Sequence, residues 1–257
     1  MNVNEYAQKL RDAQTNKILI KPLRNDIGIE DIQLAYKIQE VNIEERIKQG
    51  AEIVGKKIGL TSTIVQKQLG VDQPDFGVLL NTMEVLNGQS ISAAEILQPK
   101  VEAEYAIVLA DDLDSENLTI LDIISSIDYV LPSIEIVGSR IENWDIKITD
   151  TIADNASASH FVLGHRPKTI DEIDIIGSEV SLFKNGNLES TATGSACLGS
   201  PLNALLWLAR KMVEMDCPLQ EGEVILTGAI SKMVDVKSGD HVEVHFEGLG
   251  NVSVSFT

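Results

Sequence analysis

The spacing of hydrophobic and polar positions changes after about residue 50. Over residues 29–50 the apolar residues recur at helical spacing and Gly50 suits a C-terminal cap, so this stretch predicts a helix. We expect the first fifty residues to be mainly helical. Residues 51–60, AEIVGKKIGL, predict a short strand, and Thr61 or Ser62 is placed to cap a brief helix over residues 63–70.

From Phe76 onward short apolar runs predict strands. Asn185-Gly186 separates two of these runs, which indicates a tight hairpin. One helix interrupts them, with Ser200 as N-cap and an apolar stripe through 201–215 that we expect to pack in the core. Helices first and strands afterwards predict an α+β fold. The predicted strands are 76–81, 101–110, 129–137, 160–163, 178–184, 222–227, 240–246 and 251–256.

Composition and charge exclude several classes of protein. The chain has 257 residues, enough for one sizeable core, and no apolar run approaches the roughly 20 residues of a membrane span. Its net charge of −18 argues against nucleic acid as a partner. The N-terminus lacks the apolar core of a signal peptide, and the two cysteines suggest no disulfide framework. We therefore expect a cytoplasmic protein without membrane contact.

Two glutamates stand at the head of an apolar run in PKVEAEYAIVL, residues 99–109. Glu102 and Glu104 would share one face of a strand, and Glu135 lies alone between isoleucines in a second apolar run. Burying bare carboxylates costs several kcal/mol unless a cation or protons compensate. On neighbouring strands the three would form an oxygen site suited to Mg²⁺ or Mn²⁺. The alternative is a solvated face of an edge strand.

Two further stretches carry ionisable groups in unusual places. Lys56 and Lys57 are adjacent in a strand-like segment, so one of them must point inward. An inward lysine could hold a carboxylate or transfer protons, and burial would lower its pKa; a snorkelling side chain is the alternative. Asp75, between Pro74 and Gly77, is either a turn residue or an acid/base group.

A polar stretch, TDTIADNASASHFVLG, precedes another predicted strand. Its small hydrogen-bonding groups suit a loop or an anion pocket equally well. We single out Asn155, Ser157, Ser159 and His160. The four histidines and two cysteines lack the spacing of zinc ligands, and the glycines form no nucleotide-binding pattern.

The order of these stretches resembles a known family. GKKIGLTS, QPDFG, PKVEAE, PSIEIVGSRIENW, DTIADNASAS, GSPLNALLWLA and GEVILTG are similar to the 2-keto-4-pentenoate hydratase group of the fumarylacetoacetate hydrolase superfamily. The likeness runs from about residue 25 to the C-terminus. It implies a mixed β-roll or barrel-like core with flanking helices. It also implies a mainly helical N-terminal region, residues 1–60, and a catalytic domain, residues 61–257.

The resemblance also implies roles for individual residues. It assigns Mg²⁺ or Mn²⁺ to the three glutamates Glu102, Glu104 and Glu135. Lys57 would bind the substrate carboxylate and transfer protons, with Lys56 pointing outward. Asp75 would activate water or transfer a proton, and Ser157 would orient the substrate. Asn155, Ser159 and His160 are expected to contact it.

The implied reaction adds water to a 2-hydroxy-2,4-dienoate to give a 4-hydroxy-2-oxo acid, and we expect the enzyme to be a homo-oligomer. A second reading is a 4-oxalocrotonate-type decarboxylase, whose substrate carries a second carboxylate that a cationic His160 would meet. A third interpretation is another metal-dependent 2-oxo acid hydrolase or decarboxylase of the superfamily. A hydrolase usually needs a His–Glu pair in the N-terminal half, and all four histidines come after residue 159.

Overall fold

The computed structural model describes residues 2–62, 66, 71 and 73–257. The brief helix predicted over residues 63–70 lies outside the described residues except for residue 66. The long helix predicted over 29–50 is confirmed, and a capping box at Asn2 and Glu5 starts another before it. The helices are α1 (Val3–Asn16), α2 (Arg24–Ile27), α3 (Ile32–Lys48), α5 (Ile120–Ser125), α6 (Ile148–Ala153) and α7 (Pro201–Glu214).

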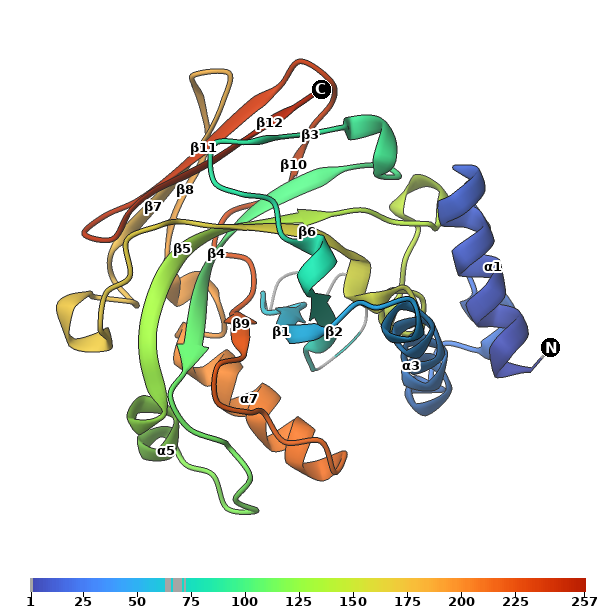
Figure 1. Cartoon of the computed structure of the whole chain (residues 1–257), viewed down its shortest axis with the longest axis horizontal. Helices are drawn as coiled ribbons and strands as arrows, with labels where there is room; N and C mark the ends of the chain where they lie inside the picture. Colours follow the sequence, from blue (N-terminus) through green and yellow to red (C-terminus); the bar gives the residue numbers. More distant parts are fainter. Residues whose placement is uncertain (1, 63–65, 67–70, 72) are drawn as a thin grey trace.

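Two sheets form the centre of the molecule (Figure 1). The larger has seven strands in the order β2-β1-β9-β4-β5-β6, with β10 paired to β4; the other has five in the order β3-β12-β11-β7-β8. The strands of the larger sheet are β1 (Ile53–Gly59), β2 (Asp75–Leu80), β4 (Lys100–Leu109), β5 (Ile127–Val137), β6 (Ala158–Leu163), β9 (Val224–Leu226) and β10 (Val234–Asp235). Those of the smaller are β3 (Ser90–Ile91), β7 (Glu179–Lys184), β8 (Asn187–Thr193), β11 (His241–Phe246) and β12 (Gly250–Phe256).

The strand predictions are confirmed to within about two residues at each end. The hairpin is also confirmed: β7 and β8 are antiparallel and joined by Asn185-Gly186, both with positive φ, as a tight two-residue turn requires. The two-residue strands β3 and β10 were not predicted, because two residues show no periodicity. The short helices α5 and α6 were not predicted either, so the expectation of one helix among the strands is wrong.

The helices pack on separate parts of the sheets. The apolar face of α7 is buried in the main core, as expected for the stripe over 201–215. α1 and α3 lie together at one side of the molecule and share a second, smaller core with α6 (Figure 1). The expected division at residue 60 stays a prediction; β1, just before it, is a strand of the larger sheet. Among the described residues, no helix is long and apolar enough to cross a membrane.

Candidate active site

The register of β4 against β5 brings the three glutamates together. Glu102 pairs directly with Glu135, so their side chains share a face, and Glu104 lies two residues further along the same face. One carboxylate oxygen from each lies within 4.8 Å of the others. Glu104 and Glu135 are 1% and 0% exposed, so the reading as a solvated edge strand is wrong.

The loop after β9 fixes the position of Glu104. It runs beside β4, where Thr227 N–H donates to Tyr105 O and Ile230 N–H donates to Ala103 O. Between these two bonds, Gly228 N–H donates to Glu104 Oε2 at 2.8 Å. Gly228 has φ +104°, and a Cβ there would lie 2.3 Å from a Thr61 side-chain atom. Gly228 ends the motif GEVILTG, but its contact with Glu104 could not be predicted from the sequence because it joins residues 124 positions apart.

β1 directs Lys57 into the same space. Its side chain is 4% exposed, with Nζ 3.2 Å from Glu135 Oε2 and donating to Ala156 O at 3.0 Å. Lys56 points to the opposite face, as expected, and pairs with Glu223 at 2.8 Å. Of the two adjacent lysines, only Lys57 lines the cavity described below.

Asp75 begins β2 opposite Gly59 of β1. Its side chain is 1% exposed, and neither carboxylate oxygen makes a well-formed hydrogen bond within the described residues. A Cβ at Gly59 would lie 2.1 Å from Asp75 Oδ1 and 3.4 Å from Lys57 Nζ. Gly59, the second glycine of GKKIG, therefore makes room for the Asp75 carboxylate. The interpretation of Asp75 as a turn residue is wrong.

We expect Gly59→Ala to displace Asp75 because the new methyl group would overlap its carboxylate. The free energy of unfolding should fall by about 1–3 kcal/mol, as for other overpacked cores, and kcat should fall with it. Denaturant unfolding measures the first effect. In an Asp75→Ala background the overlapping atom is gone, so Gly59→Ala should cost much less stability there. Equal costs in both backgrounds would contradict this account of Gly59.

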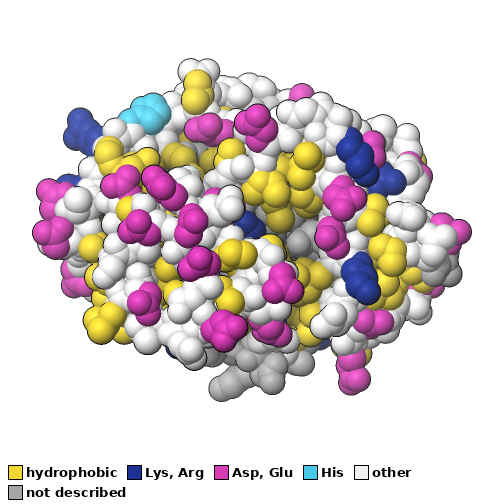
Figure 2. All heavy atoms as spheres, turned by 60° about the horizontal axis from the view of Figure 1, so that its bottom comes forward, with side chains coloured by type: hydrophobic (Ala, Val, Ile, Leu, Met, Phe, Trp, Pro, Cys, Tyr) yellow, Lys and Arg dark blue, Asp and Glu magenta, His cyan; other side chains and the backbone are white. Residues whose placement is uncertain are grey.

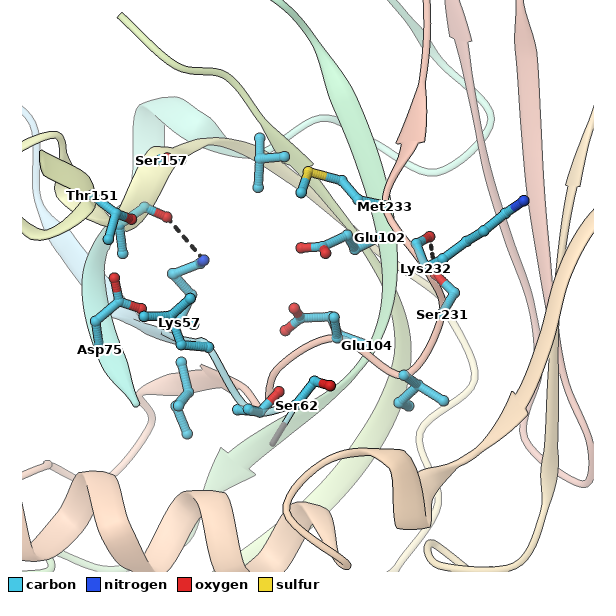
Figure 3. A pocket seen from close by; sticks show the side chains of 18 of the residues that line it. Lys57, Ser62, Asp75, Glu102, Glu104, Thr151, Ser157, Ser231, Lys232 and Met233 are labelled. Carbon is cyan, nitrogen blue, oxygen red and sulfur yellow. Dashed lines mark hydrogen bonds between the residues drawn. The ribbon is translucent and has the colours of Figure 1, made fainter. Parts of the chain in front are cut away.

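These groups line a cavity of about 380 Å³ (Figure 3). Lys57, Asp75, Thr151 and Ser157 lie on one side of it, and Glu102 and Glu104 face them from the other. The remaining wall is largely apolar and includes Val137, Trp144, Ile146, Ile230 and Met233. Figure 2 shows acidic side chains spread over much of one face of the molecule, as expected from the net charge of −18.

A strained turn before β6 supplies Ser157. Asn155, Ala156 and Ser157 have φ values of 54°, 48° and 59°, a left-handed run that non-glycine residues seldom adopt. Arg140 holds the residue before this turn, through the side chain and the carbonyl of Asp154. Ser157 Oγ is buried without a hydrogen-bond partner in the described part of the chain, and it lines the cavity.

The structure does not bring the other three predicted substrate contacts into the cavity. Asn155, Ser159 and His160 line a separate cleft next to α1 and α3. His160 pairs with Ile136, whose side chain points to the face opposite Glu135, and Ser159 is the extra residue of a bulge. Burial, then Arg46 and Lys17, lower the pKa of His160 to about 4. The expectation of a cationic His160 facing substrate is therefore corrected.

The electrostatics of the site are dominated by acids. Burial, followed by the charge of Glu135, raises the pKa of Glu102 to about 7, and the same two causes raise the pKa of Glu104 well above its usual value. Burial also raises the pKa values of Glu135 and Asp75. For Lys57, burial lowers the pKa, but the surrounding carboxylates outweigh it and raise the pKa. The expectation of a lowered lysine pKa is therefore wrong.

The donor set fits a hard divalent cation. Three carboxylates converge, and both oxygens of Glu135 are buried without a well-formed hydrogen bond in the described residues. The charge of Lys57 alone cannot neutralise Glu102, Glu104, Glu135 and Asp75 together. All-oxygen sites of this kind suit Mg²⁺ and related ions, which keep water or substrate as their remaining ligands.

Mg²⁺ affinity is expected to depend on pH. The raised pKa of Glu102, about 7, means that this group holds a proton below pH 7 in the metal-free protein. A ligand carboxylate must lose that proton, so affinity should be lost as pH falls through 7, by up to about tenfold per pH unit for one proton. Titration calorimetry at pH 6 and pH 8 measures this. An equal dissociation constant at both values would contradict the assignment of Glu102.

Comparison with known proteins places this site in a family. Residues 53–257 match the model "Fumarylacetoacetate (FAA) hydrolase C-terminal", so the chain belongs to the fumarylacetoacetate hydrolase family. Within it, the chain groups with the 2-keto-4-pentenoate hydratases. It is 50% identical over 256 residues to 2-keto-4-pentenoate hydratase 1 of Dechloromonas aromatica, covering 100% of this chain and 97% of that protein. The TodF product hydratase of Pseudomonas putida is 48% identical, with 99% and 95% covered.

A solved structure agrees with the fold over the full length. The 4-oxalocrotonate decarboxylase from Pseudomonas putida G7, complexed with magnesium and adipate, superposes with a TM-score of 0.95 at 34% identity. The match covers 99% of this chain and 97% of that one. The same enzyme complexed with calcium and acetate gives a TM-score of 0.94. Both the resemblance and the expected fold are confirmed.

Proposed function

We propose that the protein is a metal-dependent hydratase that adds water to 2-hydroxy-2,4-dienoates to give 4-hydroxy-2-oxo acids. The observation that carries the proposal is the convergence of Glu102, Glu104 and Glu135 at the wall of a small, largely apolar cavity. Lys57, which contacts Glu135, and Asp75 lie across this cavity from Glu102 and Glu104 (Figure 3). Full-length similarity to proteins named 2-keto-4-pentenoate hydratase supports the same reaction.

The three glutamates would hold Mg²⁺ or Mn²⁺. Such an ion supplies Lewis acidity toward the carboxylate and 2-oxygen of a bound 2-oxo acid. The two similar structures are complexed with magnesium and with calcium, which supports a hard divalent cation as the ion of this protein. Gly228 N–H, by holding Glu104 Oε2, keeps one ligand group oriented without an ion.

Lys57, Asp75 and Ser157 would perform the remaining chemistry. Lys57 Nζ, charged at neutral pH because its pKa is raised, binds the substrate carboxylate. Ketonisation moves a proton from the 2-hydroxyl to C5, and a carboxyl group such as Asp75 can relay it. Water then adds its oxygen to C4 and a proton to C3, with Asp75 accepting the water proton. Ser157 Oγ, which has no competing partner in the described residues, donates to a substrate oxygen.

The cavity favours a substrate with an uncharged tail. Among the described lining residues, only Lys57 and Lys232 are cationic. Lys232 has a side chain 62% exposed that points away from the cavity, so it is poorly placed for a second carboxylate (Figure 3). His160, which motivated the decarboxylase reading, lies outside. These observations favour hydration of a monocarboxylate over decarboxylation of a dicarboxylate.

Two substrates compared side by side test this proposal. Purified protein with Mg²⁺ is incubated with 2-hydroxypenta-2,4-dienoate, following loss of the dienol absorbance, and separately with 4-oxalocrotonate, assaying CO₂. We expect turnover of the first and little CO₂ from the second. CO₂ release from 4-oxalocrotonate with no turnover of the dienoate would overturn the proposal in favour of a decarboxylase.

We further propose a cytoplasmic homo-oligomer that acts on products of aromatic ring cleavage. Both cysteines are free, which is consistent with a reducing compartment. Leu86, Leu121 and Leu188 are 58–70% exposed, and an oligomer would cover such side chains. The dienoate itself is the kind of acid that cleavage of an aromatic ring produces.

A further inference from the structure

Strand β2, which carries Asp75, has a free edge. Among the residues that the structure describes, it pairs only with β1 and is the last strand of the larger sheet. The backbone groups of an edge strand need other partners when they are buried. Phe76 and Val78, whose backbone groups point to this edge, are buried. Strand pairing therefore leaves these backbone groups unsatisfied, next to the acid.

Two side-chain amides occupy this edge where a further strand would lie. Asn155 binds both backbone groups of Val78: Val78 N–H donates to Asn155 Oδ1 at 2.8 Å, and Asn155 Nδ2 donates to Val78 O at 3.0 Å. Gln39 Nε2 donates to Phe76 O at 3.0 Å. The two amides therefore bind alternate residues of β2, as the backbone of a neighbouring strand would.

The residue between them is a glycine for a steric reason. Gly77 pairs with Lys57 across the sheet, and a Cβ at Gly77 would lie 2.4 Å from Asn155 O. The turn containing Asn155 therefore lies directly against β2. This close approach lets one amide side chain reach both the N–H and the C=O of Val78.

The other contacts of the two amides are with backbone next to residues that line the cavity. Gln39 Nε2 donates to Ile152 O at 3.0 Å as well, next to Thr151 in the cavity wall. Asn155 starts the left-handed turn, whose next carbonyl, Ala156 O, accepts the hydrogen bond from Lys57 Nζ. The ring of Tyr36, also on α3, stacks on Phe76 at 4.6 Å. Both reacting groups, Asp75 and Lys57, are thus oriented by backbone that these amides hold.

We propose that Gln39 and Asn155 are positioning residues, which act together as a substitute strand that holds Asp75 and Lys57 in their reactive geometry. The inference rests on the proposed function for its kinetic consequences. It gives Asn155 a role different from the predicted substrate contact. It also makes α3 part of the active-site scaffold, although the family model begins only at residue 53.

Isosteric variants separate the hydrogen bonds from the shape of the side chains. Asn155→Asp tolerates the positive φ and keeps the acceptor for Val78 N–H, but it loses the donor and sets a charged oxygen against Val78 O. Gln39→Met keeps the length of the side chain and removes both donated bonds without burying a charge. Asn42→Asp is the matched control on α3, since its Oδ1 accepts from Arg11 and an aspartate keeps that bond.

Three readouts are taken on each variant: kcat and KM for the dienoate, the Mg²⁺ dissociation constant, and amide hydrogen exchange of residues 75–80. For Asn155→Asp and Gln39→Met we expect kcat to fall about 10- to 100-fold, as for other small misplacements of reacting groups. Exchange in β2 should be faster, while KM and Mg²⁺ affinity change little. Asn42→Asp should match the wild type in all three.

Two results would overturn the inference. One is wild-type kcat in Asn155→Asp and Gln39→Met. The other is a loss of kcat accompanied by equal losses of Mg²⁺ affinity and melting temperature, which would show general damage to the fold. Failure of the proposed function looks different, because the wild type itself would not hydrate the dienoate. In that case, unchanged amide hydrogen exchange of residues 75–80 in both variants would still contradict the claim that the two amides hold β2. Faster exchange would support that claim.

Discussion

Glu104→Gln is expected to abolish metal-dependent turnover, lowering kcat/KM by more than about a hundredfold, the size of effect that lesser changes around metal ligands already reach. The amide has the shape of the carboxylate, and its oxygen can still accept the hydrogen bond from Gly228 N–H. The fold should therefore survive, while the site loses one of three anionic ligands. Steady-state kinetics with added Mg²⁺ and a chelated sample measure the effect.

The same substitution should stabilise the metal-free protein. Burial and the neighbouring charges raise the pKa of Glu104 well above its usual value, so its ionised form is disfavoured in the fold. Removing that charge is expected to increase the free energy of unfolding by an amount on the order of 1 kcal/mol at neutral pH. Added Mg²⁺ should stabilise the variant less than the wild type. Glu223→Gln is the control for turnover and for stabilisation by Mg²⁺, because Glu223 pairs with Lys56 away from the cavity. Full activity of Glu104→Gln would contradict the metal assignment.

Lys57→Met is expected to lower kcat by about a hundredfold or more, because the substrate carboxylate loses the cation that orients it. Nζ of Lys57 is also a buried cation 3.2 Å from Glu135, so it would compete with a metal ion for that carboxylate. Mg²⁺ binding should therefore persist or become tighter in the variant. The combination of lost turnover with retained metal affinity distinguishes a reacting group from a ligand. Kinetics and titration calorimetry on the same preparation measure both.

Lys56→Met provides a control one residue away in the same strand. It removes the same charge, but from the opposite face of β1, where the partner is Glu223. We expect it to keep most of the turnover and to lose some stability, since it leaves the Glu223 carboxylate unpaired. If the two lysine variants lost activity equally, Lys57 would have no special role.

Element types could be predicted from the sequence, and the contacts between elements could not. The apolar runs of β4 and β5 and the caps of α7 are local signals, and they gave strands and a helix close to those observed. Which residue of β4 lies opposite Glu135 depends on register, which a single run does not show. The isolated glutamates in two apolar runs suggested a shared oxygen site, and the family resemblance then assigned the metal to Glu102, Glu104 and Glu135.

The wrong predictions about individual side chains also come from contacts between elements, which the sequence does not show. Ser159 and His160 were expected beside the substrate because they are polar residues of the stretch that supplies Ser157, and a cationic His160 would suit a second carboxylate. The left-handed turn and the bulge that follows it change which face each side chain takes, so only Ser157 reaches the cavity. The pKa of Lys57 was predicted from burial alone, and the four carboxylates that reverse its direction come from three other strands. The roles of Gly59 and Gln39 likewise depend on long-range contacts.

The most direct test of the central claim is the product formed by the metal-loaded enzyme. Wild-type protein is stripped with a chelator, divided, and given 2-hydroxypenta-2,4-dienoate with or without Mg²⁺, and the products are identified by proton NMR. The three-glutamate site predicts 4-hydroxy-2-oxopentanoate only in the sample with Mg²⁺, and in neither sample of Glu104→Gln. Equal formation of this product in the chelated wild type, or its absence after Mg²⁺ is restored, would contradict the account.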